Sequence, residues 1–237
     1  SGYDPSERSS MSVVLDNFDL VLKAFGYTVW LFLVSAVLSL FLGTVLVAMR
    51  VGPIAVLRAA AATYITLVRN TPLVMIFLFF QLAAPKIGVN FSWVDVHIGQ
   101  FDFTSFFTSA VVALSLYTST FVAEALRSGV NSVQLGQAEA ARAIGLPFGG
   151  VMTQVVLPQA FRASVPPLAS TLIAMLKNTS VAAVFGVIEA AGQMRRFTND
   201  HSDERWGIFL AFALGYIILV EVVSLLAVLL ERRWRIA

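Results

Sequence analysis

Five long apolar segments decide what kind of fold this chain can adopt. A helix needs about 20 mostly apolar residues to cross the hydrocarbon core of a bilayer. Segments of that length occupy residues 25–49, 59–84, 105–126, 165–188 and 206–230. Because a backbone surrounded by lipid must satisfy its own hydrogen bonds, each segment is expected to be a helix. The sequence therefore predicts an all-α membrane protein with five transmembrane helices.

The composition agrees with lipid as the main solvent of this 237-residue chain. Hydrophobic residues make up 58% of it and charged residues only 13%, whereas average soluble domains carry about 25% charged residues. The net charge of +2 gives no reason to expect a nucleic-acid partner, and the absence of cysteine excludes a thiolate metal site. Residues 1–10 are polar, and we interpret them as a native tail or a cloning remnant. Residues 11–237 are then one transmembrane domain.

The distribution of Lys and Arg between the loops predicts the orientation of the chain. These residues accumulate in cytoplasmic loops. Eight lie in the 50–58 loop, the 127–164 loop and the C-terminal segment, and six lie in the N-terminal segment, the 85–104 loop and the 189–205 loop. The excess predicts an N-terminus outside the cell and a C-terminus in the cytoplasm.

The longest segment between two predicted spans, residues 127–164, contains a short polar helix. Its centre reads QAEAARAIG over residues 137–145. Ala and Glu favour a helix, and Gly145 followed by Pro147 is expected to end it. A second helical stretch, residues 150–154, leads to the fourth span. A short helix held between two spans can transmit force when a partner protein grips it.

The spacing within this loop resembles the EAA loop of bacterial ABC importer permeases. The matching positions are Glu139, Ala140, Ala141, Gly145, Val155, Leu157 and Pro158. Val155 stands where the family often has Ile. The resemblance implies a type I ABC importer permease fold in which residues 137–158 form a cytoplasmic coupling loop. It also implies which residues couple the loop to a partner ATPase: Glu139, Ala140, Ala141, Gly145, Leu157 and Pro158.

Three further segments resemble elements of the polar amino acid permeases. Residues 69–73 (RNTPL) resemble R-G-T-P-L, with Asn70 in place of Gly. Residues 123–130 (AEALRSGV) resemble A-E-x-x-R-G-G-I, with Ser128 as the departure, and residues 177–180 (KNTS) match K-N-T-S. The resemblance covers about residue 18 to the C-terminus and is closest to actinobacterial glutamate-type permeases. It implies uptake of a polar amino acid across the bacterial plasma membrane, with glutamate first and glutamine or aspartate as alternatives.

The resemblance also implies the partners of the chain. They are an ATP-binding-cassette ATPase dimer that binds ATP and Mg, an extracellular solute-binding protein, and a second permease subunit. The second permease is identical or homologous to this chain, and we favour a heterodimer. The sequence has no G-x-x-x-x-G-K-[ST] motif, so ATP hydrolysis is expected from the partner and no cofactor from this chain.

Charged and polar residues inside the predicted spans are the candidates for the substrate pathway, because a charge near the bilayer centre costs about 3 kcal/mol. One interpretation is that they line the pathway, where Arg69 or Lys177 meets a substrate carboxylate. The other is that these cations pair with Glu124 or Glu221 and hold the helices together. Both remain open for Lys177 and Glu124, and the structural role is favoured for Arg69. The candidates are Arg69, Asn70, Thr71, Glu124, Lys177, Asn178, Thr179 and Ser180.

Other function classes explain less of the sequence. An ion-coupled secondary transporter would explain the charges within the spans but not the spacing of the 137–158 loop. An intramembrane enzyme would need a catalytic group, and His97 and His201 lie in predicted loops without metal-ligand spacing. A membrane anchor without transport activity would not need the loop.

Overall fold

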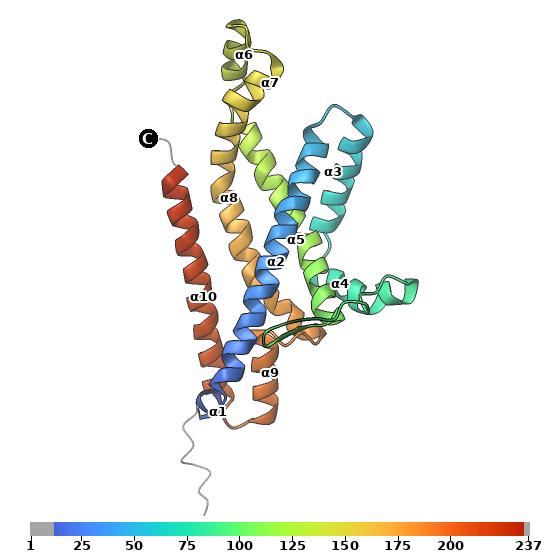
Figure 1. Ribbon diagram of the computed structural model, residues 1–237, viewed down its shortest axis with the longest axis vertical. Helices are drawn as coiled ribbons and strands as arrows, with labels where there is room; N and C mark the ends of the chain where they lie inside the picture. Colours follow the sequence, from blue (N-terminus) through green and yellow to red (C-terminus); the bar gives the residue numbers. More distant parts are fainter. Residues whose placement is uncertain (1–11, 235–237) are drawn as a thin grey trace, which may run out of the picture. The chain divides into compact units, whose positions relative to one another are not determined.

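The computed structural model describes residues 12–234, and its regular elements are helices apart from one short hairpin (Figure 1). The polar segment 1–10 lies outside the described residues. The elements are α1 (Ser12–Asp16), α2 (Phe18–Val51), α3 (Ala55–Arg69), α4 (Leu73–Leu78), the π-helical η2 (Phe79–Ala83), the 3₁₀-helical η3 (Ala84–Ile87), β1 (Val96–Ile98), β2 (Phe101–Phe103), α5 (Ser105–Asn131), α6 (Leu135–Ala143), α7 (Phe148–Val151), the π-helical η4 (Met152–Val156), α8 (Leu157–Asn178), the 3₁₀-helical η5 (Thr179–Phe185), α9 (Ala190–Asp200) and α10 (Arg205–Trp234).

Four helical segments in the described part of the chain are long and apolar enough to cross a membrane. They are Phe18–Val51, Ser105–Asn131, Phe148–Phe185 and Arg205–Arg233. Ala55–Arg69 and Leu73–Ile87 add a fifth if the pair is counted as one broken span. The predicted spans overlap all of these segments.

The second predicted span is broken at Pro72, where the sequence predicts a kink. Pro72 has no backbone N–H and cannot continue the helical hydrogen-bond pattern. Accordingly, α3 ends at Arg69 and α4 begins at Leu73.

The chain forms two compact units. Among the described residues, the first unit comprises 12–35, 73–114 and 176–222, and the second comprises 36–72, 115–175 and 223–234.

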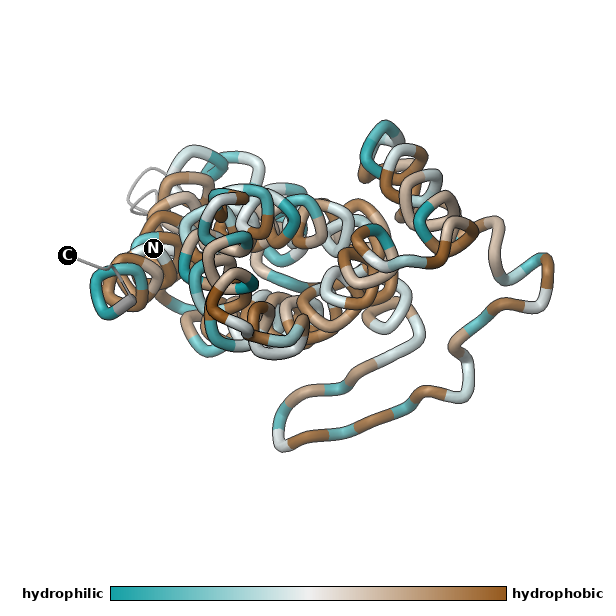
Figure 2. The backbone as a smooth tube through the Cα atoms, turned by 90° about the horizontal axis from the view of Figure 1, so that it is seen from above, coloured by the Kyte–Doolittle hydropathy of each residue, from teal (hydrophilic) through white to brown (hydrophobic). Residues whose placement is uncertain are grey.

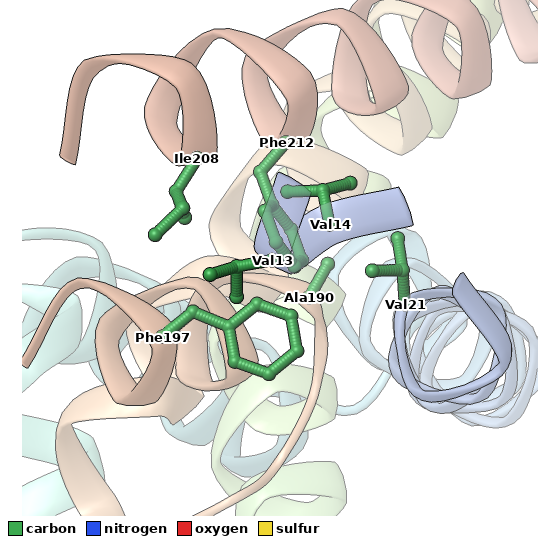
Figure 3. Close-up of a cluster of buried hydrophobic side chains, with 7 residues drawn as sticks. All are labelled: Val13, Val14, Val21, Ala190, Phe197, Ile208 and Phe212. Carbon is green, nitrogen blue, oxygen red and sulfur yellow. The ribbon is translucent and has the colours of Figure 1, made fainter. Parts of the chain in front are cut away.

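An apolar cluster in the first unit holds the short helices α1 and α9 to the ends of α2 and α10. Figure 3 shows the side chains pointing toward one another from these four helices. The ring of Phe25 stacks on Phe212, with the ring centroids 5.8 Å apart. The members of the cluster are Val13, Val14, Val21, Ala190, Phe197, Ile208 and Phe212.

The carboxyl group of Glu189 ties α9 to α2 and α10 within the same unit. It caps α9 by accepting hydrogen bonds from the backbone N–H groups of Ala191 (3.0 Å) and Gly192 (2.9 Å). The hydroxyl of Tyr216 donates to it at 2.6 Å and that of Thr28 at 3.3 Å. Glu189 is completely buried. Burial raises the pKa of this carboxyl group because the charged form loses its hydration, and the hydrogen bonds oppose that effect.

The loop before α5 contains an antiparallel hairpin, in which His97 of β1 faces Asp102 of β2. This extended segment alternates between hydrophobic and hydrophilic residues (Figure 2). His97 was expected in an ordinary loop, but its Nδ1 lies 2.6 Å from the Asp102 carboxylate. The Asp102 contact and the nearby Asp95 raise the pKa of His97. The Tyr27 hydroxyl accepts a hydrogen bond from the Asp102 N–H at 2.8 Å, so the hairpin is joined to α2.

In the second unit, α5 lies close to α3 and α8. The Tyr64 hydroxyl of α3 donates to the Leu116 carbonyl oxygen of α5 at 3.1 Å. A methyl group at Gly129 would overlap the Ala160 carbonyl oxygen and the Ser164 side chain. Small residues thus allow two helices to approach closely, as in many membrane proteins.

We expect Glu189→Gln to lose less stability than Glu189→Leu. The single Gln oxygen can replace Oε2, which accepts from Ala191, Tyr216 and Thr28, whereas the Gly192 N–H loses its acceptor Oε1. Leu leaves the N–H groups of Ala191 and Gly192 and the Tyr216 hydroxyl without their acceptor, at about 1–3 kcal/mol for each buried group. The measurement is the temperature at which half of the detergent-purified protein has aggregated. Equal losses in both variants would contradict the assigned role of the hydrogen bonds.

Candidate functional site

Helix α6 ends in a Schellman motif at Gly145. The Gly145 N–H donates to the Arg142 carbonyl oxygen at 2.9 Å, and the Leu146 N–H donates to that of Ala141 at 3.1 Å. Gly145 has a φ of 88°, a left-handed conformation that glycine adopts without strain. The predicted end of the polar helix at Gly145 is therefore confirmed.

The loop that contains α6 has an apolar core of its own. Ala141, Val151 and Val156 are buried against one another, and Leu146 packs on them. The helical stretch expected at 150–154 is α7 followed by the π-helical η4. Figure 1 shows α6 and α7 packed together beyond the first turns of α8. The loop is thus a folded knob within the second unit.

The outer surface of the knob is partly apolar. Leu135 and Ile144 are each 81% exposed, and Phe148 is 70% exposed. Sequence reasoning did not single out these three residues, although apolar side chains in a polar loop are a signal for a docking surface.

The residues named from the EAA resemblance divide between the outside and the inside of the knob. Glu139 and Ala140 are exposed, as are Leu157 and Pro158 in the first turn of α8. Ala141 faces the core of the loop and supports it from within.

The break after α3 is held by local hydrogen bonds. The Asn70 N–H donates to the Thr66 carbonyl oxygen at 3.3 Å, and the Thr71 hydroxyl donates to that of Leu67 at 2.8 Å. The guanidinium of Arg69 lies over the ring of Phe121, 5.2 Å from its centroid. A cation on an aromatic face is stabilised by the negative potential of the ring.

Glu124 pairs with two arginines of the second unit. Its carboxylate oxygens lie 3.5 Å from Arg50 and 3.3 Å from Arg127. Arg69 of the same unit does not pair with Glu124 among the described residues, and its partner is the Phe121 ring. Sequence reasoning missed Arg50 because it assigned this residue to a loop, whereas α2 continues through it.

Lys177 and Glu221 line a pocket of about 430 Å³ in the first unit. Ser180 and Tyr216 contribute to the same pocket. Among the described residues, the Lys177 ammonium and the Glu221 carboxylate are too far apart to form an ion pair. The pocket therefore presents a cation and an anion separately, an arrangement that suits a ligand with both charges.

The other KNTS residues are engaged with their own backbone. The Thr179 hydroxyl is buried and donates to the Leu176 carbonyl oxygen at 2.7 Å, and the Ser180 hydroxyl donates to that of Lys177 at 2.8 Å. Asn178 is the last residue of α8, after which the chain becomes 3₁₀-helical. Over the described residues, no group of three or more His or acidic side chains is placed to hold a metal ion.

Comparisons with known proteins identify the family of the chain. Residues 40–236 match the family described as binding-protein-dependent transport system inner membrane component. The chain is 44% identical over 200 residues to the glutamate transport system permease protein GluC of Corynebacterium efficiens, which is 84% of this chain and 87% of that protein. It is 30% identical over 220 residues to the glutamate/aspartate import permease protein GltJ of Escherichia coli, with 90% and 87% covered.

A solved structure is also similar to this chain. A crystal structure of an amino acid ABC transporter with histidines aligns with a TM-score of 0.83 and 25% identity, over 95% of this chain and 99% of the other. The helical architecture is thus that of a type I ABC importer permease. The family match covers most of the chain, so this multi-pass protein of the bacterial plasma membrane belongs to the family of binding-protein-dependent transport system inner membrane components.

Proposed function

We propose that this chain is the permease subunit of an ABC importer for a polar amino acid, with glutamate as its first substrate. The observation that carries the substrate is the 44% identity to GluC over 84% of the chain. Aspartate is the next candidate, since the printed name of GltJ includes it. Glutamine remains an alternative from the sequence.

We further propose a topology of five spans with the N-terminus outside and the C-terminus in the cytoplasm. The broken pair Ala55–Arg69 and Leu73–Ile87 supplies the fifth span. The excess of Arg on the side of the α6 loop supports this orientation. The α6–α7 knob then lies in the cytoplasm.

In this proposal the knob is the surface that receives force from the ATPase dimer. Its own core and its Schellman end make it rigid, and Leu135, Ile144 and Phe148 offer apolar area to a groove. ATP and Mg bind to the partner ATPase. A solute-binding protein delivers the amino acid outside, and a second permease subunit completes the pathway.

Among the charges within the spans, Lys177 is the group we assign to the substrate carboxylate. It is exposed, it lines a pocket with Glu221, and it lacks an ion-pair partner in the described chain. Arg69 and Glu124 are assigned to holding the second unit together, because both have partners there. Asn70 and Thr71 are assigned to stabilising the break in the second span through their hydrogen bonds to the last turn of α3.

Membership of a binding-protein-dependent family argues against the ion-coupled secondary transporter. The two mechanisms differ in their energy source. Uptake by vesicles that contain the permeases but no ATPase, driven by an ion gradient, would overturn the ABC proposal.

The substrate is tested with the complex purified together with its ATPase and its solute-binding protein. We expect glutamate to stimulate ATP hydrolysis most strongly among the twenty amino acids, because its binding protein delivers it to the pathway. The rate of phosphate release is measured for each amino acid. Stronger stimulation by a basic or apolar amino acid would contradict the assignment.

We expect Gly145→Pro to separate ATP hydrolysis from uptake. Proline fixes φ near −65° and lacks the N–H that bonds to Arg142, so the end of α6 cannot form. Glutamate uptake by proteoliposomes should fall at least tenfold while basal ATP hydrolysis persists.

The control for this variant is Gly149→Ala, because Gly149 has an ordinary backbone conformation and open space around it. It should transport like the wild type. Normal uptake by Gly145→Pro would show that the knob does not transmit force.

We expect Lys177→Ala to raise the glutamate concentration needed for half-maximal uptake at least fivefold, because the substrate carboxylate loses its cation. Lys86→Ala is the control, since Lys86 is an exposed lysine of η3 that does not line this pocket. A Lys177→Ala variant with a lower yield but unchanged half-saturation would assign Lys177 a structural role.

A further inference from the structure

The first unit contains another pocket, formed by different residues from those around Lys177. Its volume is about 430 Å³, within the range of sites that bind small molecules. Its wall comes from the N-terminal part of α2, the start of α5, the turn at 186–188 and α9. No residue of this pocket is a candidate from the sequence.

The charged groups at this pocket leave a surplus of positive charge. Lys23 of α2 and Arg196 of α9 both line it, and neither forms an ion pair with any other residue in 12–234. Asp102 is the acidic residue of the wall, and its carboxylate is engaged by His97 at 2.6 Å. Two cations on different helices are therefore available to an anionic ligand.

The side-chain amide of Gln193 completes the polar wall. Gln193 as a whole is only 7% exposed and lines the pocket. Its backbone N–H bonds to the Glu189 carbonyl oxygen at 2.9 Å. Its side-chain amide is not one of the buried polar atoms that lack a partner, so the amide is accessible and can form hydrogen bonds with a ligand in the pocket.

We propose that this pocket binds an acidic amino acid on the outer side, before it enters the spans. The proposal rests on the proposed function and its orientation. Lys23 and Arg196 would each bind a carboxylate, and the Gln193 carbonyl oxygen accepts from the ammonium group. Phe107 and Val187, both buried, provide an apolar surface for the methylene groups. A pocket of this volume with two cations and an amide in its wall fits a free small molecule better than the side chain of a docked protein.

The test measures equilibrium binding of radiolabelled glutamate and glutamine to the whole transporter complex in nanodiscs, without the solute-binding protein. The complex carries Lys177→Ala, so binding at the Lys177 pocket is weakened at least fivefold and contributes less to the signal. We expect saturable glutamate binding that Arg196→Gln weakens about tenfold, as for the loss of a charge-assisted hydrogen bond. Glutamine lacks the second carboxylate, so it should bind weakly to the complex with or without Arg196→Gln. The substitution should change glutamine binding less than glutamate binding.

Arg195→Gln is the matched control. Arg195 precedes Arg196 on α9, is exposed like it, and does not line the pocket. It should leave glutamate binding within twofold. Both substitutions remove one exposed charge, so folding is expected to be intact, and a monodisperse elution profile checks this.

Three results would overturn the proposed glutamate site. One is the absence of saturable glutamate binding in the Lys177→Ala complex, and another is an equal effect of Arg195→Gln and Arg196→Gln. The third is an Arg196→Gln variant that loses affinity for the solute-binding protein but binds glutamate normally. Glutamate uptake by the wild-type complex tests the proposed function separately. If the complex imports glutamate but shows no binding at this pocket, the proposed function stands and only the inference about the pocket fails.

Discussion

The Glu189 carboxyl group fixes the start of α9, and both pockets of the first unit depend on where α9 and its neighbours lie. Its hydrogen bond from Tyr216 holds a side chain that lines the Lys177 pocket. The backbone carbonyl oxygen of Glu189 accepts a hydrogen bond from the N–H of Gln193, a residue that lines the other pocket. A buried carboxyl group with four donors around it is stable only when all of them are correctly placed. Glu189 therefore positions groups in both sites, one through its side chain and the other through its backbone.

The second unit contains a loop with its own core, and under the proposed function this loop has to keep its shape while force passes through it. Its α6 knob buries Ala141 inside and ends α6 by backbone hydrogen bonds at Gly145. The core of the loop and the end of α6 are thus formed by residues of the loop itself. The Glu124 pairs with Arg50 and Arg127 connect the end of α5, which precedes the knob, to the end of α2.

Sequence reasoning predicted the features that depend on local pattern. Apolar length is enough to place the spans, and Gly145 after an Ala-rich stretch is enough to end α6. It missed contacts between residues far apart in the chain, because no local pattern relates Arg50 to Glu124 or Glu189 to Tyr216. The hairpin was missed since its strands have three residues each, too few for a periodic pattern. Gln193 gave no signal, because an amide in a loop is ordinary until its burial is known.

The partners of the cations separate structural roles from binding roles. In the second unit Arg50 and Arg127 share the Glu124 carboxylate, and Arg69 lies over an aromatic ring, so each of these cations already has a partner. In the first unit each pocket is lined by cations that have no ion-pair partner in the described chain. They are Lys177 in one pocket and Lys23 and Arg196 in the other. A cation that already has a partner gains less from a substrate carboxylate than a cation without one. An acidic amino acid that passes through the first unit would therefore leave the free cations of one pocket for the free cation of the other. The affinity of each pocket must be low enough to release the amino acid to the next site.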